Sequence, residues 1–134
     1  MMTGFGRGPT MDVAVDLERQ LSVAVGWGSL SVYDVSEIRR PVLKAALAGL
    51  GNTRKIILKD QLAFVAARED GVWIIDLSEP STPKILFQYD SIEWASGLAI
   101  DGPFLAVACR QHGVELVNVE DPRRPKHFST LFRG

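Results

Sequence analysis

The 134 residues of this chain are enough for one domain with a hydrophobic core and too few for two of ordinary size. Hydrophobic residues make up 46% and charged residues 23% of the sequence, as in globular proteins, which argues against a disordered chain. The net charge of −1 leaves no global excess of charge to attract nucleic acid or anionic lipid. The single cysteine excludes an intrachain disulfide and a cysteine-based zinc site, and no apolar run approaches the length of a membrane span.

The sequence repeats itself at an interval of 42 residues. Four sets of residues share this interval: Pro41, Pro83 and Pro125; Asp34, Asp76 and Asn118; Val23-Ala24, Val65-Ala66 and Val107-Ala108; and Ser29, Gly71 and Gly113. Each copy contains four short segments rich in Val, Ile, Leu, Phe and Trp, which are typical of β-strands joined by tight turns. The expected strands are 12–15, 21–25, 29–35 and 41–47; 54–58, 62–67, 71–77 and 83–89; and 97–100, 104–109, 113–119 and 125–132. Only the first strand of the first copy falls about a residue out of register, because its turn DLERQ is longer than KDQ or DGP.

The third strand of each copy is apolar on both faces. In the second copy Val72 and Ile74 point to one face, and Ile75 and Leu77 point to the other. Each sheet must therefore be covered on both sides, as a propeller blade is by its neighbours. The segment PVLKAALAGL also fits a helix, but its repeat equivalents PKILFQYD and PKHFSTLF do not.

The sequence thus predicts an all-β, β-propeller-like fold with three four-stranded antiparallel blades of about 42 residues each. Such an arc is either a partial propeller or half of a six-bladed ring. We expect a flexible leader at residues 1–10 and a single repeat domain at 11–134. Its blades are expected at about 11–50, 51–92 and 93–134.

The segments GVWIIDLSEPSTPKIL and EWASGLAIDGPFLAVA resemble the LVIVD-repeat family, whose motif is a strand ending in Asp, a Ser/Asp-Pro turn and another proline. SLSVYDVSEIRRPVL and GVELVNVEDPRRPKHF are weaker copies, so the resemblance covers roughly residues 12–134. The chain departs from the motif at Ile38, where the other copies have Pro80 and Pro122, and at Asn118 in place of Asp. The resemblance implies β-propeller-type repeats and says little about function. Family members are often surface-associated, which allows a cell-surface or extracellular location for a fragment, whereas the lack of an export signal in this sequence makes the cytoplasm the default.

Residues with catalytic or metal-binding potential have structural interpretations that fit the repeat better. Asp34, Asp76 and Asn118 stand where a side chain can accept hydrogen bonds from the following turn, and Asn118 would be a poor metal ligand. Cys109 and His112 are spaced like a nucleophile and its base, but Cys109 occupies an apolar strand position. His127 is expected to be a partly buried packing residue. GFGRG at 4–8 lacks the preceding strand and following helix of a phosphate loop, so we expect no catalytic residue, metal or cofactor.

The two edges of the arc differ in what their turns carry. Arg39-Arg40 and Arg123-Arg124 make one edge basic, but its turns lack the aromatic residues that stack on nucleic acid, so we expect solvated turns and no nucleic-acid partner. The other edge, formed by the second-to-third strand turns and the blade-to-blade links, collects varied polar residues and two tryptophans. Its candidate binding residues are Trp27, Asn52, Arg54, Arg68, Glu69, Asp70, Glu93, Trp94, Arg110, Gln111 and His112. This composition suits a protein interface or a small polar ligand, with ordinary surface loops as the alternative.

These features favour a non-catalytic module for protein binding or self-assembly. The alternative is part of a propeller enzyme or small-ligand-binding protein with its site at the central channel, although the first strands carry few groups for it. The terminal blades are expected to expose apolar faces, because neither copy has acquired a polar outer face. The first copy retains the apolar residues Val23, Val25, Leu30 and Val32, and the third is expected to expose Leu116, Val117 and Val119. We therefore expect a head-to-tail homodimer closing a six-bladed ring, or completion by further repeats of the same protein.

Overall fold

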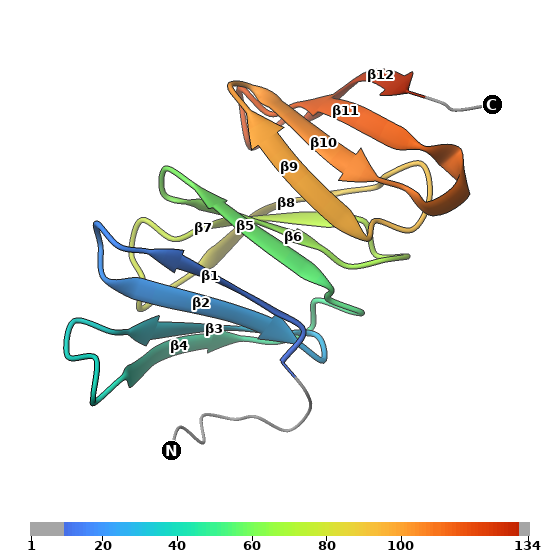
Figure 1. Cartoon of the computed structure of the whole chain (residues 1–134). Helices are drawn as coiled ribbons and strands as arrows, with labels where there is room; N and C mark the ends of the chain where they lie inside the picture. Colours follow the sequence, from blue (N-terminus) through green and yellow to red (C-terminus); the bar gives the residue numbers. More distant parts are fainter. Residues whose placement is uncertain (1–9, 132–134) are drawn as a thin grey trace.

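Residues 10–131, the part of the chain that the computed structural model describes, form three antiparallel sheets stacked in chain order (Figure 1). Blade 1 consists of β1 (Asp12–Asp16), β2 (Leu21–Gly26), β3 (Ser29–Asp34) and β4 (Val42–Leu47). Blade 2 consists of β5 (Lys55–Lys59), β6 (Leu62–Ala66), β7 (Val72–Asp76) and β8 (Lys84–Tyr89). Blade 3 consists of β9 (Gly97–Asp101), β10 (Phe104–Ala108), β11 (Val114–Asn118) and β12 (Lys126–Leu131), with a 3-10 turn, η1 (Arg110–His112), between β10 and β11.

The predicted fold class is confirmed. Within each sheet the strands are ordered as they occur in the chain and pair antiparallel, as short connections require. Each strand begins and ends within one residue of its predicted bounds, and PVLKAALAGL forms β4 instead of a helix. Within the described range there is no helix that could cross a membrane. The predicted leader at 1–10 lies, apart from Thr10, outside the described residues.

The side-chain oxygens of three repeat-equivalent residues close the turns after the third strands. Asp34 accepts a hydrogen bond from the backbone N–H of Ser36 (2.8 Å), Asp76 from that of Ser78 (2.8 Å), and Asn118 from that of Glu120 (2.9 Å). These bonds hold the pKa of Asp34 and that of Asp76 below the usual carboxyl value, because they favour the charged form. The structural interpretation of the Asp-Asp-Asn series is therefore confirmed.

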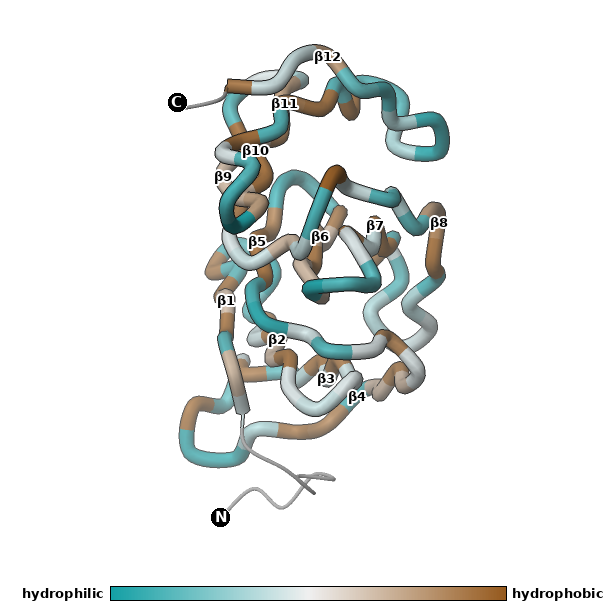
Figure 2. The backbone as a smooth tube through the Cα atoms, turned by 90° about the vertical axis from the view of Figure 1, so that its right-hand side faces the viewer, coloured by the Kyte–Doolittle hydropathy of each residue, from teal (hydrophilic) through white to brown (hydrophobic). Residues whose placement is uncertain are grey.

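The core of the molecule lies between the blades. Figure 2 shows β1, β5 and β9 along one side of the stack, with β4 and β8 on the other. Blade 2 is covered on both faces: Ala63, Val65 and Ile75 pack toward blade 1, and Phe64 and Ile74 pack toward blade 3. Each of these five side chains is at most 1% exposed. Burial of a side chain the size of Val, Ile or Phe contributes roughly 1.5–3 kcal/mol, so the blades stabilise one another.

The turn between β2 and β3 is shorter than the equivalent turn in blade 2, and this exchanges the two faces of β2. Val25 pairs with Leu30 in blade 1, whereas Ala66 pairs with Val72 in blade 2, so the connection in blade 1 is one residue shorter. The predicted equivalence of Val23-Ala24 with Val65-Ala66 is therefore wrong by one residue. Because a one-residue shift moves a side chain to the opposite face, Val23 packs toward the next blade while Val65 packs toward the preceding one.

The two open faces consequently differ from what the sequence predicted. In blade 1, Val23, Val25, Leu30 and Val32 are all buried against blade 2. Ser22, Ala24 and Tyr33 lie on its open face. Val13 and Val15 of β1 lie there too, since they pair with Ala24 and Ser22, and they are 53% and 55% exposed. The prediction that the first copy would expose those four apolar side chains is wrong. The shorter turn moves Val23 and Val25 to the covered side, and Leu30 and Val32 face the next blade as their repeat equivalents Val72 and Ile74 do.

The open face of blade 3 is more apolar. Val117 and Val119 are buried against blade 2, so the prediction that they would be exposed is wrong. Phe104, Val114 and Leu116 point the other way, as the alternation along paired strands requires, and are only partly buried. The Phe104 ring lies 4.8 Å, centroid to centroid, from that of Phe128, which is 60% exposed.

A buried carboxylate joins blades 2 and 3. Glu115, 2% exposed, accepts hydrogen bonds from the Tyr89 hydroxyl and from the backbone N–H of Ile92 (2.9 Å), and its Oε2 lies 2.8 Å from His127 Nδ1. His127 is half exposed, which fits its prediction as a partly buried residue, but it pairs with this carboxylate, which the sequence did not predict. At the repeat-equivalent position of blade 2, Trp73 donates its indole N–H to Leu50 O (2.8 Å). The side chain at this position thus forms a hydrogen bond at both blade junctions: an indole N–H donates at the first, and a carboxylate accepts at the second.

Candidate binding rim

The second-to-third strand turns and the links between blades lie at one end of the sheets, which we call the rim. Backbone hydrogen bonds tie each link to a turn: Leu50 N–H donates to Gly28 O (2.8 Å), and Arg68 N–H donates to Ala95 O (2.8 Å). The same geometry places repeat-equivalent side chains on the rim. Trp27, Arg68 and Arg110 each follow the second strand of their blade and adopt positive φ angles of 48°, 49° and 47°. Non-glycine residues rarely take this conformation, so the three turns share an uncommon backbone geometry.

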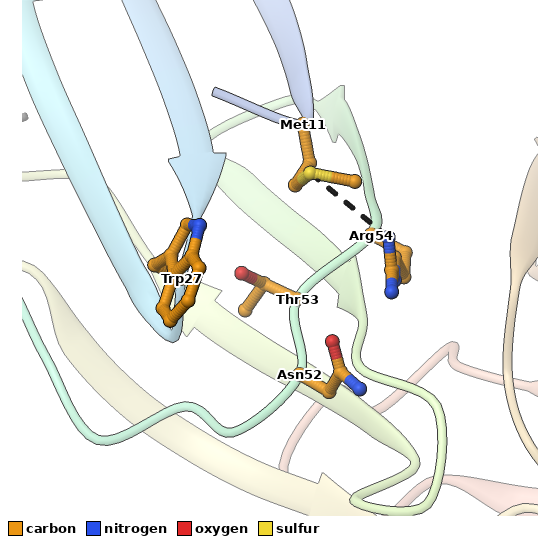
Figure 3. A pocket seen from close by; sticks show the side chains of 5 residues that line it. All are labelled: Met11, Trp27, Asn52, Thr53 and Arg54. Atoms are coloured by element: carbon orange, nitrogen blue, oxygen red, sulfur yellow. Dashed lines mark hydrogen bonds between the residues drawn. The ribbon is translucent and has the colours of Figure 1, made fainter. Parts of the chain in front are cut away.

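The rim between blades 1 and 2 contains a pocket of about 620 Å³, lined by Met11, Trp27, Asn52, Thr53 and Arg54, which we call the first rim pocket (Figure 3). Trp27 is 72% exposed, and Figure 3 shows Thr53 of the link between Trp27 and Arg54. Thr53 is buried, and its hydroxyl accepts a hydrogen bond from Gly28 N–H (3.2 Å), which joins the link to the Trp27 turn. This volume is typical of small-ligand pockets.

Sequence reasoning identified three of these lining residues and missed Met11 and Thr53. Thr53 stands between two candidates, Asn52 and Arg54, and differs from them in being buried. Met11 is the repeat equivalent of Arg54. Each donates its backbone N–H to the last residue of the second strand that pairs with the first strand, Val25 O (2.8 Å) and Ala66 O (2.7 Å) respectively. The register shift in the first copy concealed that equivalence.

The rim between blades 2 and 3 forms a second group, the Trp94 cluster, made by Arg68, Glu93, Trp94, Arg110, Gln111 and His112. The guanidinium carbons of Arg68 and Arg110 lie 5.2 and 4.3 Å from the centroid of the Trp94 ring, within cation–π range. Glu93 Oε1 lies 2.7 Å from His112 Nδ1 and accepts the Gln111 N–H (3.2 Å). The hydrogen bond with His112 lowers the pKa of Glu93 below its usual value.

The remaining two candidates lie between these groups on the β6–β7 turn. Glu69 is exposed. The Asp70 carboxylate packs against Gly51 of the link, so closely that a Cβ built on Gly51 would lie 1.9 Å from Asp70 Oδ2. The eleven predicted residues therefore form two separate groups with this turn between them.

The structure does not pair Cys109 with His112. The Cys109 thiol is fully buried, its Sγ lies 3.5 Å from Val107 O, and burial raises the pKa of the thiol. The His112 Nδ1 faces Glu93 instead. A thiol with a raised pKa is a weak nucleophile near neutral pH. The glycine-rich segment at 4–8 lies outside the described residues.

Three stacked four-stranded meanders, each buried against the next, define a β-propeller-like repeat protein. The sequence matches the LVIVD repeat model over residues 7–48 and again over 50–91, and the chain belongs to the LVIVD repeat family. The third copy lies outside these two matches. A comparison with curated proteins finds no match.

Solved structures with similar folds share little sequence with this chain. The computationally designed Ika4 protein is 11% identical with a TM-score of 0.78, over 98% of this chain and 76% of Ika4. Sqt1 from Saccharomyces cerevisiae is 12% identical with a TM-score of 0.76, over 93% of this chain and 35% of Sqt1. A functionally unknown protein from Desulfotomaculum acetoxidans is 12% identical with a TM-score of 0.71, over 96% of this chain and 44% of that protein. The chain thus spans about three quarters of Ika4 and less than half of the other two, and the likeness concerns the fold alone.

Proposed function

We propose that this chain is a non-catalytic β-propeller module that binds a protein partner through the rim. The observation that carries the proposal is the exposure of Trp27 at 72% on a backbone turn of unusual conformation, beside a pocket. Tryptophan and arginine dominate the energetics of protein interfaces, and both types meet at each blade junction of the rim. The buried Cys109 thiol, whose pKa is raised by burial, also favours binding over nucleophilic catalysis.

Replacing Trp27 and Trp94 together with alanine is expected to abolish peptide capture without shifting the melting temperature. The measurement selects peptides from a random phage-displayed library on the immobilised chain, then compares the affinity of one selected peptide for each variant. We expect a loss of at least about tenfold for the double variant, because an aromatic hot spot contributes that much. The matched control replaces Arg123 and Arg124 on the opposite edge with alanine and should leave the affinity unchanged. Equal losses of affinity and stability would show that the tryptophans are packing residues.

A second candidate function is self-assembly through the open face of blade 3. In blade 2 the residues Ala66, Val72 and Ile74 are fully buried by the following blade. Their repeat equivalents in blade 3, Ala108, Val114 and Leu116, have no such cover within residues 10–131. An apolar face that the repeat elsewhere buries favours a second copy of this chain, or a further repeat, as its cover.

Sedimentation equilibrium is expected to show a dimer at micromolar concentration. Two arcs related by a rotation axis would close one ring of six blades, as predicted from the sequence. Replacing Leu116 with aspartate should shift the equilibrium to monomer, because a charge on the covered face is costly. Ile38→Asp is the matched control, since Ile38 is 82% exposed on the opposite edge. A wild-type monomer that melts cooperatively at micromolar concentration would refute self-closure.

A further inference from the structure

Arg54 brings an uncompensated positive charge to the first rim pocket. Its backbone is fixed at the start of β5 by the hydrogen bond to Ala66 O (2.7 Å). The nearest partner of its guanidinium is the Met11 thioether, with Arg54 Nη1 3.9 Å from Met11 Sδ (Figure 3). Arg54 Nε is buried and makes no hydrogen bond with the described residues. A guanidinium has five N–H donors, so this group has unused capacity for an acceptor.

In the part of the chain that the structure describes, no carboxylate forms an ion pair with this group. Among residues 10–131, the ion pairs join Lys55 to Asp12, His112 to Glu93 and His127 to Glu115, and none involves Arg54. Two acids of neighbouring segments have other contacts: Asp12 Oδ2 accepts a hydrogen bond from the Ile56 N–H (2.9 Å), and Asp70 packs against Gly51. Residues 1–9 and 132–134 contain no Asp or Glu. Within residues 10–131 Arg54 thus has no anionic partner, and a bound ligand can supply one.

Two of the other lining residues, Met11 and Trp27, are apolar. Met11 and Trp27 are 38% and 72% exposed, and both lie beside the link that carries Thr53 (Figure 3). A ligand that fills this space needs an apolar or aromatic group beside its negative charge. Carboxylates form bidentate, charge-assisted hydrogen bonds with arginine, which is the geometry that the planar guanidinium favours.

We propose that the first rim pocket binds a carboxylate next to an aromatic side chain, carried by an acidic peptide segment of the partner. This inference rests on the proposed function of the rim and adds the chemistry of the partner. Arg54 binds the carboxylate, Asn52 supplies an amide at the same wall, and Trp27 with Met11 holds the aromatic ring.

The test uses two arrays of acetylated, amidated hexapeptides that are identical except that one has a central Phe-Glu and the other a central Phe-Gln. Wild-type chain is expected to bind the Phe-Glu array at least about tenfold more strongly, the effect of one charge-assisted hydrogen bond. Arg54→Gln should abolish this preference, and Arg54→Lys should keep part of it. Arg124→Gln, a matched arginine on the opposite edge, should leave the preference unchanged. Melting temperatures confirm that each variant is folded.

The outcomes separate this inference from the proposed function. Equal binding of both arrays by wild-type chain, or a preference that survives Arg54→Gln, overturns the carboxylate assignment. If Trp27→Ala then still weakens binding to both arrays, the proposed function stands alone. If Trp27→Ala changes neither, both fail. Free 3-phenylpropionate distinguishes the source of the acid: displacement of the peptides at concentrations equal to their own would assign the pocket to a small carboxylic acid and overturn the peptide assignment.

Discussion

Replacing Gly71 with alanine is expected to destabilise the chain by about 3 kcal/mol, which lowers Tm by roughly 10 °C. Gly71 is buried with φ of +77°, and a Cβ built there would lie 2.0 Å from the backbone oxygen of Tyr89. Alanine therefore meets both an unfavourable backbone conformation and a contact with backbone atoms that cannot move aside. Thermal or urea denaturation measures the loss.

Gly102→Ala is the matched control for the backbone effect. Gly102 also has a positive φ, +57°, but a Cβ built there would meet no atom within 4 Å. We expect a loss of only about 1 kcal/mol, the cost of the conformation itself. Equal effects of the two substitutions would show that the contact with Tyr89 is relieved by a small shift of the β6–β7 turn, and the tight packing inferred for this turn would be wrong.

Removing the buried Glu115 side chain is expected to cost about 3 kcal/mol, because it leaves the Tyr89 hydroxyl and the Ile92 N–H without an acceptor between blades 2 and 3. Glu115→Ala should therefore lower the urea midpoint strongly. Glu120→Ala serves as the control, since Glu120 is exposed and only its backbone N–H takes part in a hydrogen bond. A small effect of Glu115→Ala would show that water replaces the carboxylate at this junction.

The same junction predicts a loss of stability at alkaline pH. Burial, then the hydrogen bond to Glu115, raises the pKa of Tyr89 above its ordinary value of 10.0. Above about pH 10 the unfolded chain loses the phenol proton while the folded chain keeps it, so the unfolded state binds fewer protons and stability falls as pH rises. Burial also raises the pKa of Cys109, which acts in the same direction. In Tyr89→Phe the decline between pH 10 and 11 should be smaller, and an unchanged decline would exclude Tyr89 as its source.

Local features of the sequence were sufficient to predict the strands and their turns. The 42-residue interval, the alternation of apolar residues and the Asp or Asn that accepts a turn hydrogen bond all act within a few neighbouring residues. Such short-range chemistry does not depend on which blade lies beside it. The strand bounds therefore agree with the structure to within one residue.

The first rim pocket could be predicted only in part. Trp27, Asn52 and Arg54 are recognisable because turns and links of an antiparallel blade meet at one end. Met11 was missed because its equivalence to Arg54 depends on a strand register that the longer turn after β1 conceals. The separation of the rim into two groups depends on the path of the β6–β7 turn, in which Asp70 packs against Gly51.

The sequence by itself determined the repeat, the strands and the end of the blades where varied residues gather, because these follow from local spacing and side-chain alternation. Only the tertiary structure decided which face each side chain occupies at the ends of the arc. One residue fewer between β2 and β3 moves Val23 to the covered side of blade 1, and the pairing of β10 with β11 leaves Leu116 on the open side of blade 3 while Val117 is buried. The tertiary structure also decided that Glu115 accepts hydrogen bonds from Tyr89 and Ile92, whereas Trp73, its repeat equivalent in blade 2, donates one to Leu50. The physical reason is that a strand's faces alternate with every residue, so one inserted or deleted residue exchanges them, and only contact with the neighbouring blade shows which face is buried.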